Sequence, residues 1–256
     1  MAAILKFRQF IQGFVLLLSS TLLVGAIMFA ETRQVGKTCQ GIELVIVGDA
    51  PSQLVDKQAL LRCLTAHTSR SIIGAPLQGQ ATRSIENTIK THNFVREGVV
   101  YKTWQGMLKI NIFPRRPIAR ILYPYQQSQY IDEDGTLLPL SDQYTARVLL
   151  VETEKLSGVS EHLNTYPYGT ALLALLNYID RDPFWRAQIA HMCIDQAGKI
   201  TMHTQVSKQR IEFGLPESIE PKLAKLKLFY QQIVPYKGWN TYKRVNLEFD
   251  KQIVCE

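Results

Sequence analysis

The sequence lacks the short motifs that commonly mark an enzyme active site. It contains no G-x-S-x-G nucleophile turn, no Walker phosphate loop, no glycine-rich dinucleotide fingerprint and no H-E-x-x-H pattern. The adjacent acids Asp132, Glu133 and Asp134 precede Gly135, where a solvated hairpin turn explains them better than paired catalytic carboxylates. We therefore expect a protein without catalytic activity, without a cofactor and without a small-molecule substrate.

Cysteine is scarce and dispersed. The four cysteines are Cys39, Cys63, Cys193 and Cys255, and no two of them form a C-x-x-C pair, which argues against a zinc ribbon and a thioredoxin-like dithiol. Four cysteines allow three complete disulfide connectivities, and an exported location would permit one bridge. We expect the cysteines to be mostly buried apolar residues.

Histidine is equally scattered, at His67, His92, His162, His191 and His203. The nearest approach to a metal cluster is His191, Cys193 and His203, because the first two would share one face of a strand and the third belongs to the next predicted strand. No carboxylate stands in register with them in the sequence. We expect ordinary strand residues here and no metal site.

Positive charge is in excess but has no dense cluster. The net charge is +7, and the basic residues occur singly or in pairs such as Arg115-Arg116 and Lys243-Arg244. Because no zinc-finger spacing or RNA-binding motif accompanies them, the charge does not indicate a nucleic-acid partner. A solvated basic surface near lipid headgroups is the preferred interpretation.

Only one long apolar run is present. Gln9 to Ala30 contains 22 residues without a charge, and at about 1.5 Å per helical residue it would span roughly 33 Å, close to the hydrocarbon thickness of a bilayer. The run predicts a single transmembrane helix at 10–30, after a cytoplasmic tail at 1–9 and before a polar linker at 31–40. Val24-Gly25-Ala26 also fits a signal-peptide cleavage site, but the apolar run exceeds the usual length for such a peptide.

Two prolines divide the remainder into two parts, each large enough for a core of its own. Pro114 ends an alternating apolar and polar strand, and Pro117 opens another. The first part, 41–115, predicts the order strand, helix, helix, strand, strand. The expected elements are residues 42–48, 55–64, 81–91, 93–102 and 104–113.

The second part, 116–256, predicts a mixed β domain with flanking helices, so the chain as a whole belongs to the α+β class. Expected strands are 118–123, 136–140, 147–151, 188–195, 199–206, 209–213 and a long last strand within 242–255, with helices at 169–179 and from Pro221 onward. The helix after Pro221 carries Lys222, Lys225 and Lys227 on one side, which we interpret as solvated surface or as a contact for lipid headgroups or an acidic helix.

This order of features resembles the FtsQ/DivIB family of bacterial cell-division proteins. There a strand ending a POTRA domain runs through an R-x-P-V/I-A-R segment into a domain that opens with a Y-x-D-x-x-G hairpin. The matching residues are Trp104, Leu108, Ile110, Arg116, Pro117, Ile118, Ala119, Arg120, Tyr130, Asp132, Gly135 and Leu140. A K-L-x-x-L helix and a final strand with alternating apolar residues extend the resemblance over nearly the whole chain.

The resemblance implies a non-catalytic bitopic scaffold of the bacterial divisome that links FtsB-like and FtsL-like partners to septal peptidoglycan synthesis. Such a protein lies in the bacterial inner (plasma) membrane at the division septum, with a cytoplasmic N-terminus and both domains outside the cytoplasm. The lipid bilayer and other divisome membrane proteins are further implied partners. The 41–115 part would be the POTRA-like domain and 116–256 the FtsQ-like β domain.

The resemblance also implies where the partner binds. In the family the partner contributes a strand to the edge formed by the last strand of the second domain. Carried over by position, the partner-binding residues are Arg244, Val245, Leu247, Glu248, Phe249, Lys251 and Ile253. Glu248 departs from the basic residue common in the family, and Phe249 faces either the interface or the core.

Two other classes remain as alternatives. A POTRA-bearing periplasmic transport or chaperone component usually has several POTRA units before a membrane β-barrel, and 116–256 shows no long series of lipid-facing strands. A membrane-anchored cell-wall hydrolase would need a catalytic constellation that the sequence does not show.

Overall fold

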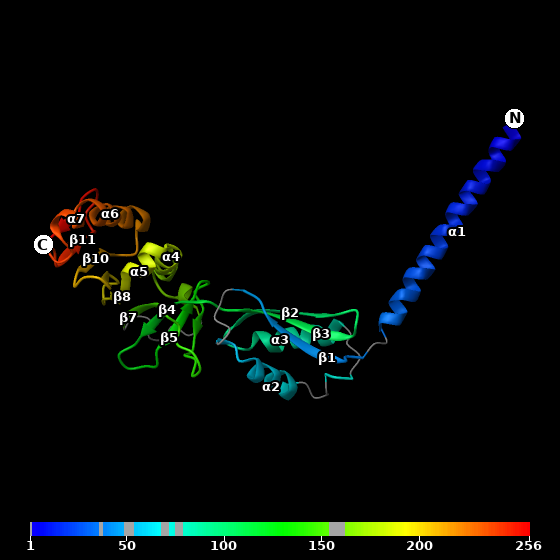
Figure 1. Ribbon diagram of the computed structural model, residues 1–256, viewed down its shortest axis with the longest axis horizontal. Coiled ribbons are helices and arrows are strands. Elements are labelled where there is room, and N and C mark those ends of the chain that lie inside the picture. Colours follow the sequence, from blue (N-terminus) through cyan, green and yellow to red (C-terminus); the bar gives the residue numbers. More distant parts are fainter. Residues whose placement is uncertain (1, 36–37, 49–53, 68–71, 75–78, 154–161) are drawn as a thin grey trace. The chain divides into compact units, whose positions relative to one another are not determined.

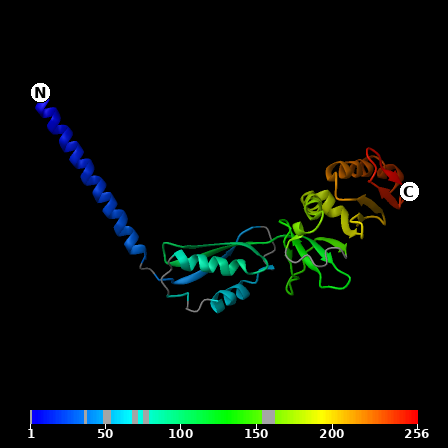
Figure 2. The same ribbon diagram turned by 180° about the vertical axis from the view of Figure 1, so that it is seen from behind.

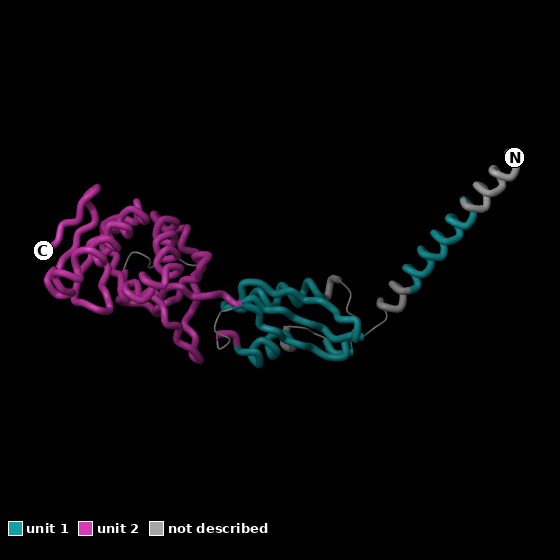
Figure 3. The backbone as a smooth tube through the Cα atoms, turned by 45° about the horizontal axis from the view of Figure 1, so that its top comes forward, with its two compact units in different colours: residues 1–48, 56–113 teal, residues 49–55, 114–256 magenta. Residues whose placement is uncertain are grey.

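The computed structural model describes residues 2–35, 38–48, 54–67, 72–74, 79–153 and 162–256. It divides the chain into two compact units, of which the first comprises residues 1–48 and 56–113 and the second comprises residues 49–55 and 114–256. Figure 3 distinguishes the two units by colour. Each unit has a sheet of its own, and each is described separately below.

The helix α1 covers Ala2–Val35. From Phe14 to Phe29, every large apolar side chain of this helix is exposed. Among the helices whose residues the structure describes, none combines the length and the apolar character needed to cross a bilayer. The membrane span at 10–30 stays a prediction, and residues 36–37 of the predicted linker lie outside the described residues.

In its described residues, the first unit contains, besides α1, two helices and one three-stranded sheet of order β1-β3-β2 (Figure 1). The elements are β1 (Gly41–Ile46), α2 (Lys57–His67), α3 (Gly79–Lys90), β2 (Val95–Lys102) and β3 (Met107–Pro114). The central strand β3 alternates strictly, with Leu108, Ile110 and Ile112 fully buried. The predicted strand-helix-helix-strand-strand order is confirmed, with no boundary shifted by more than three residues.

Helix α3 packs on the edge strand β2. Gly98 allows this close approach, because a Cβ at that position would lie 2.8 Å from Cγ2 of Ile89 on α3. The Val100 amide of β2 donates to Oε1 of Glu86, also on α3, at 3.0 Å. An outward-facing N–H of this edge is therefore satisfied within the chain.

In its described residues, the second unit contains one nine-stranded mixed sheet, called the large sheet below, of order β12-β11-β10-β9-β8-β7-β4-β5-β6. Its strands are β4 (Pro117–Leu122), β5 (Gln129–Asp132), β6 (Leu137–Leu138), β7 (Leu149–Thr153), β8 (Ile189–Ile194), β9 (Ile200–Thr204), β10 (Arg210–Gly214), β11 (Arg244–Asn246) and β12 (Val254–Cys255). Strands β4, β7 and β8 are parallel neighbours, as are β10 and β11, whereas β8, β9 and β10 are antiparallel.

The helices bury one face of the large sheet. They are η2 (Leu163–Thr165), α4 (Gly169–Arg181), α5 (Pro183–Gln188), α6 (Ile219–Gln232) and α7 (Val234–Lys237). The core joins strand residues such as Val151, Met192 and Ile211 to Leu176 of α4 and Leu226 of α6. The other face, called the open face below, carries the alternate and mostly polar residues of the same strands. Figure 2 shows the ribbon of this unit from behind.

Three predicted features differ in the structure. Helix α6 begins at Ile219, before Pro221, which fits the first helical turn because an N–H is not needed there. A short helix that was not predicted, α5, begins at Pro183, and Asp182 caps it by accepting a hydrogen bond from the Phe184 amide at 2.8 Å. The single last strand expected within 242–255 is divided into β11 and β12.

All four cysteines of the sequence lie in described ranges and are free thiols. Cys39 is buried, as expected. Cys63, Cys193 and Cys255 are only half-buried, so the expectation that most of them are core residues was wrong.

Candidate functional site

Strand β12 forms one edge of the large sheet. Arg244 and Glu256 exchange both backbone hydrogen bonds at 3.0 Å, so the next opposed pair, Val245 and Cys255, lies at a non-hydrogen-bonded position of this antiparallel ladder. The N–H and C=O of Cys255 therefore point away from β11. They offer a backbone donor and acceptor to a strand added outside β12.

The apolar residues expected to bind a partner point mostly inward. Val245 and Leu247 are completely buried, and Ile253 is half-buried and packs against the core. Their side chains hold the edge in place and do not form its surface. Phe249, in contrast, is 48% exposed. Of the two positions considered for this residue, interface or core, the structure therefore excludes the core.

The charged residues of the edge are engaged in ion pairs on the open face. Nε of Arg244 donates to Glu212 at 2.8 Å, and its Nη1 donates to Glu256 at 2.9 Å. Asn246 and Arg210 also donate to Glu212, at 2.9 and 3.0 Å. The hydrogen bond from Arg244, followed by the charges of both arginines, lowers the pKa of Glu212 below its usual range. This network fixes β10 and β11 side by side.

Lys225 organises the segment between β11 and β12. Its Nζ donates to the carbonyl oxygens of Leu247, Phe249 and Gln252, at 3.4, 2.6 and 3.4 Å. Lys251 adopts a positive φ of 58°, which turns the chain back toward β11. These contacts explain why the expected long strand is interrupted, and they leave Phe249 and Lys251 exposed on the resulting loop.

The Lys-rich side of α6 is therefore not a free solvated surface. Lys222 donates to the carbonyl oxygens of Phe213 and Leu215 at 2.9 Å, and Lys227 pairs with Asp182 at 3.6 Å. Glu248, expected to contact a partner, pairs with Lys199 at 2.9 Å. Sequence reasoning missed these intramolecular roles because each contact joins residues of different elements, and periodicity does not reveal how elements pack.

In the acidic turn, Asp134 is exposed as expected, but Asp132 is buried and has a structural role. Asp132 is 1% exposed, accepts the amides of Asp134 and Thr136 through Oδ1, and pairs with Arg115 at 2.7 Å through Oδ2. Arg116 pairs with Glu133 at 3.2 Å and with Asp180 at 2.7 Å. These charges clamp the incoming chain to the hairpin and to α4.

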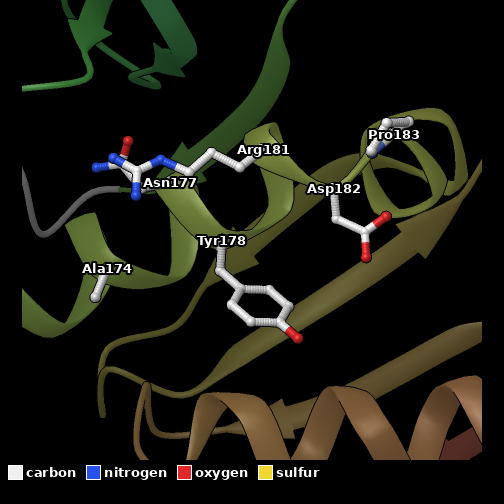
Figure 4. Close-up of a pocket in the computed structure, with 6 residues that line it drawn as sticks. All are labelled: Ala174, Asn177, Tyr178, Arg181, Asp182 and Pro183. Carbon is white, nitrogen blue, oxygen red and sulfur yellow. The ribbon is translucent and has the colours of Figure 1, made fainter.

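A shallow depression lies at the end of α4, lined by Ala174, Asn177, Tyr178, Arg181, Asp182 and Pro183 (Figure 4). The carboxylate among the lining residues, that of Asp182, is already engaged in contacts within the chain. The Asp182 carboxylate caps α5 and pairs with Lys227. Asp182 therefore has a structural role at this depression.

These features define a class of protein in which a POTRA-like module precedes a second domain whose mixed sheet keeps an accessible edge. A family model for the POTRA-like domain matches residues 37–113. A second model, FtsQ/DivIB, C-terminal related, matches residues 116–256. Because this second match covers more than half of the sequence, the chain belongs to the FtsQ/DivIB family.

The family match confirms the resemblance inferred from the sequence, and with the structure it confirms the α+β class. It identifies a cell-division scaffold family associated with the membrane at the division site and with other division proteins. A comparison with curated proteins finds no match.

Proposed function

We propose that this chain is a non-catalytic, membrane-anchored scaffold of the bacterial divisome, and that the β12 edge receives a strand from an FtsB-like partner held by an FtsL-like protein. In this role it links those partners to septal peptidoglycan synthesis. The observation that carries the proposal is the outward-facing backbone of Cys255 on an edge strand of a domain that belongs to the FtsQ/DivIB family.

The apolar surface of α1 supports the anchor. The large apolar side chains between Phe14 and Phe29 are all exposed and form an apolar surface that water solvates poorly. Together with the uncharged run from Gln9 to Ala30, they favour insertion into the bacterial inner membrane. The N-terminal tail would then be cytoplasmic and both folded units would lie on the other side.

Strand addition at β12 accounts for both affinity and selectivity. Backbone hydrogen bonds to an edge strand provide affinity for any extended peptide, and the neighbouring side chains select among peptides. Here the loop beside β12 presents an exposed aromatic ring, Phe249, and an exposed cation, Lys251. A partner strand with an apolar residue near Phe249 and an acidic residue near Lys251 fits this surface.

The buried members of the predicted site have a supporting role in this proposal. Val245, Leu247 and Ile253 anchor the edge to the core, while Arg244 and Glu248 fix it through Glu212 and Lys199. Substituting them would weaken partner binding indirectly, by loosening the edge. Direct contacts are reserved for the β12 backbone, Phe249 and Lys251.

A proline exchange tests the backbone contact. Cys255→Pro removes an N–H that points outward, so it should leave the pairing of β12 with β11 intact and weaken binding of the FtsB-like and FtsL-like pair from the same genome at least tenfold. Phe249→Arg should weaken binding several-fold without lowering the melting temperature, because the ring is 48% exposed. Affinity is measured with purified full-length proteins in detergent.

The matched control is Val254→Pro. Val254 opposes Asn246 at a hydrogen-bonded position, so this proline removes an inward N–H and should detach β12 itself. Unchanged affinity in Cys255→Pro would contradict strand addition at this edge. Selective binding of outer-membrane proteins instead of the division pair would favour the transport or chaperone class.

A further inference from the structure

The open face of the large sheet brings together donor groups that are far apart in the sequence. Among the described residues, the ligand atoms of His191, Cys193 and His203 all lie within 4.8 Å of one another. Strand register explains the cluster, because His191 and Cys193 lie two apart on β8 and His203 directly opposes His191 on β9. Met192, which lies between His191 and Cys193, and Met202, which precedes His203, point into the core and are fully buried.

The structure supplies the carboxylate that the sequence did not reveal. Glu152 on β7 opposes Cys193 on β8. Its Oε2 lies 3.3 Å from Nε2 of His191 and 3.9 Å from Sγ of Cys193. The premise that no acidic group stands in register with the cluster was therefore wrong, since β7 and β8 are parallel neighbours despite a separation of about 40 residues in the chain.

From this geometry we infer that His191, Cys193 and His203 form a binding site for a zinc-class divalent metal ion, with Glu152 as the residue that orients His191. Thiolate and imidazole are the donors that Zn²⁺ prefers. The inference goes beyond the proposed scaffold role and does not depend on it.

The interatomic distances fit tetrahedral coordination. Bonds of about 2.3 Å to sulfur and about 2.0 Å to nitrogen place the two ligand atoms roughly 3.5 Å apart in a tetrahedron. Nδ1 of His191 lies 3.8 Å from Sγ of Cys193. The ring of His203 stacks on that of His191, with centroids 5.6 Å apart. All three ligand atoms lie within 4.8 Å of one another, so binding one ion requires only small rotations of these half-exposed side chains.

The position of Glu152 assigns the nitrogen atoms. When His191 binds a metal through Nδ1, its Nε2–H is free to donate to the Glu152 carboxylate, which lies 3.3 Å away. Metal-ligating histidines usually make such a bond with their second nitrogen. A thiolate and a nearby carboxylate also neutralise a divalent charge. The one cation opposite His203, Arg210, is paired with Glu212 at 3.0 Å.

In a tetrahedral site, three protein donors leave one coordination position free. Water can fill it because the site faces solvent. The bound ion would connect β8 and β9 at the middle of the large sheet, and the contact between Glu152 and His191 would join β7 to the site. Strands β10 and β11 separate these strands from β12, so the metal site and the proposed partner edge are distinct. Cu²⁺ would bind such a donor set at least as tightly as Zn²⁺, so affinity alone does not identify the ion used in the cell.

Cobalt substitution tests the site in the full-length protein, purified without a polyhistidine tag and freed of metal by a chelator. Titration with Co²⁺ should produce a thiolate-to-cobalt charge-transfer absorption at one equivalent, and added Zn²⁺ should displace it. Cys193→Ser should abolish this absorption, and His203→Gln should weaken binding. Glu152→Gln should raise the dissociation constant about 10–100-fold.

The matched control is Cys255→Ser, because Cys255 is a half-buried thiol of the same unit that packs on the core side of the sheet. This variant should retain the absorption. A missing band in the unmodified protein, or a band that survives Cys193→Ser, would overturn the inference. If Cys193→Ser does not fold, Zn²⁺ must slow alkylation of Cys193 but not of Cys255 in the unmodified protein, and equal rates would refute the site.

Partner binding provides an independent readout. Cys193→Ser should bind the FtsB-like and FtsL-like pair as tightly as the unmodified chain, whereas Cys255→Pro should bind Co²⁺ normally. Each proposal can therefore fail while the other stands.

Discussion

The two ends of the large sheet use charged residues in opposite ways. At the β4-β5-β6 end, Asp132 is 1% exposed and its partner Arg115 is largely buried, with side-chain exposure of 22%. At the β12 end, the Arg244 side chain is 39% exposed and that of Glu256 is 62% exposed. The Asp132–Arg115 pair is thus enclosed, and the Arg244–Glu256 pair is displayed.

The difference follows from desolvation. A buried ion pair must have all its hydrogen-bonding capacity satisfied, and the loss of one partner leaves an uncompensated charge. An exposed pair contributes little, since water replaces a lost partner. The first end is therefore a fixed structural joint, whereas the second can exchange contacts with a partner at low cost. The following tests aim at this contrast.

The largest effect is expected at the enclosed end. Asp132→Ala removes the acceptor of two turn amides and leaves Arg115 unpaired, so the free energy of unfolding should fall by about 3 kcal/mol. Urea unfolding of the full-length protein measures it. Asp142→Ala, at an exposed position, is the control and should change stability by less than about 0.5 kcal/mol. Similar losses in both variants would show that the hairpin does not depend on the buried carboxylate.

A smaller effect on stability, accompanied by a functional one, is expected for Lys225→Met. The substitution keeps most of the aliphatic stem but removes the donor to the carbonyls of Leu247, Phe249 and Gln252, at a cost of about 1–2 kcal/mol. Because the β11–β12 loop loses its fixed shape, affinity for the division pair should fall about tenfold.

Lys227→Met on the same helix is the comparison, since Lys227 pairs with Asp182 and lies over the Phe184 ring, and neither residue belongs to the loop. Calorimetric titration with the purified partner pair distinguishes the two variants. An equal loss of affinity in both would mean that α6 acts through its overall charge, and that the loop geometry is irrelevant.

The sequence was sufficient to predict the elements whose buried residues recur at the regular spacing of a strand or a helix. Leu108, Ile110 and Ile112 predict β3, and the spacing of Leu172, Leu175 and Leu176 predicts α4; both are confirmed. The order of strands in the large sheet was not predictable in this way. Parallel neighbours such as β7 and β8 join segments far apart in the chain, and periodicity contains no information on which segments pair.

The candidate site shows the same limit. Alternation predicted one strand through Val245, Leu247 and Phe249, but only the first two are buried. The strand ends because Lys225, some 22 to 27 residues earlier, draws three carbonyl oxygens toward itself. Asp250-Lys251 is the one local signal of a turn, and it is weak. The cluster at Cys193 was likewise recognised only in part, because Glu152 comes from a distant strand.

The smallest effect is expected for Glu212→Gln at the displayed end. The hydrogen bond from Arg244 lowers the pKa of Glu212 in the folded protein. A carboxyl group whose pKa is lowered by folding stabilises the folded state at pH values above its ordinary pKa. This stabilisation is lost as the pH falls through the folded-state pKa. The unmodified chain should therefore lose about 0.5 kcal/mol more than the variant between pH 7 and pH 3.

Urea unfolding at the two pH values measures this difference, with Glu217→Gln, at an exposed position, as the control that should follow the unmodified chain. The effect stays small because the Arg244 side chain is 39% exposed and water solvates it when Glu212 is neutral. If Glu212→Gln instead cost as much as Asp132→Ala, the two ends of the large sheet would be equally rigid. The β12 edge would then be a structural joint like the other end, and a partner would find no exchangeable contacts there.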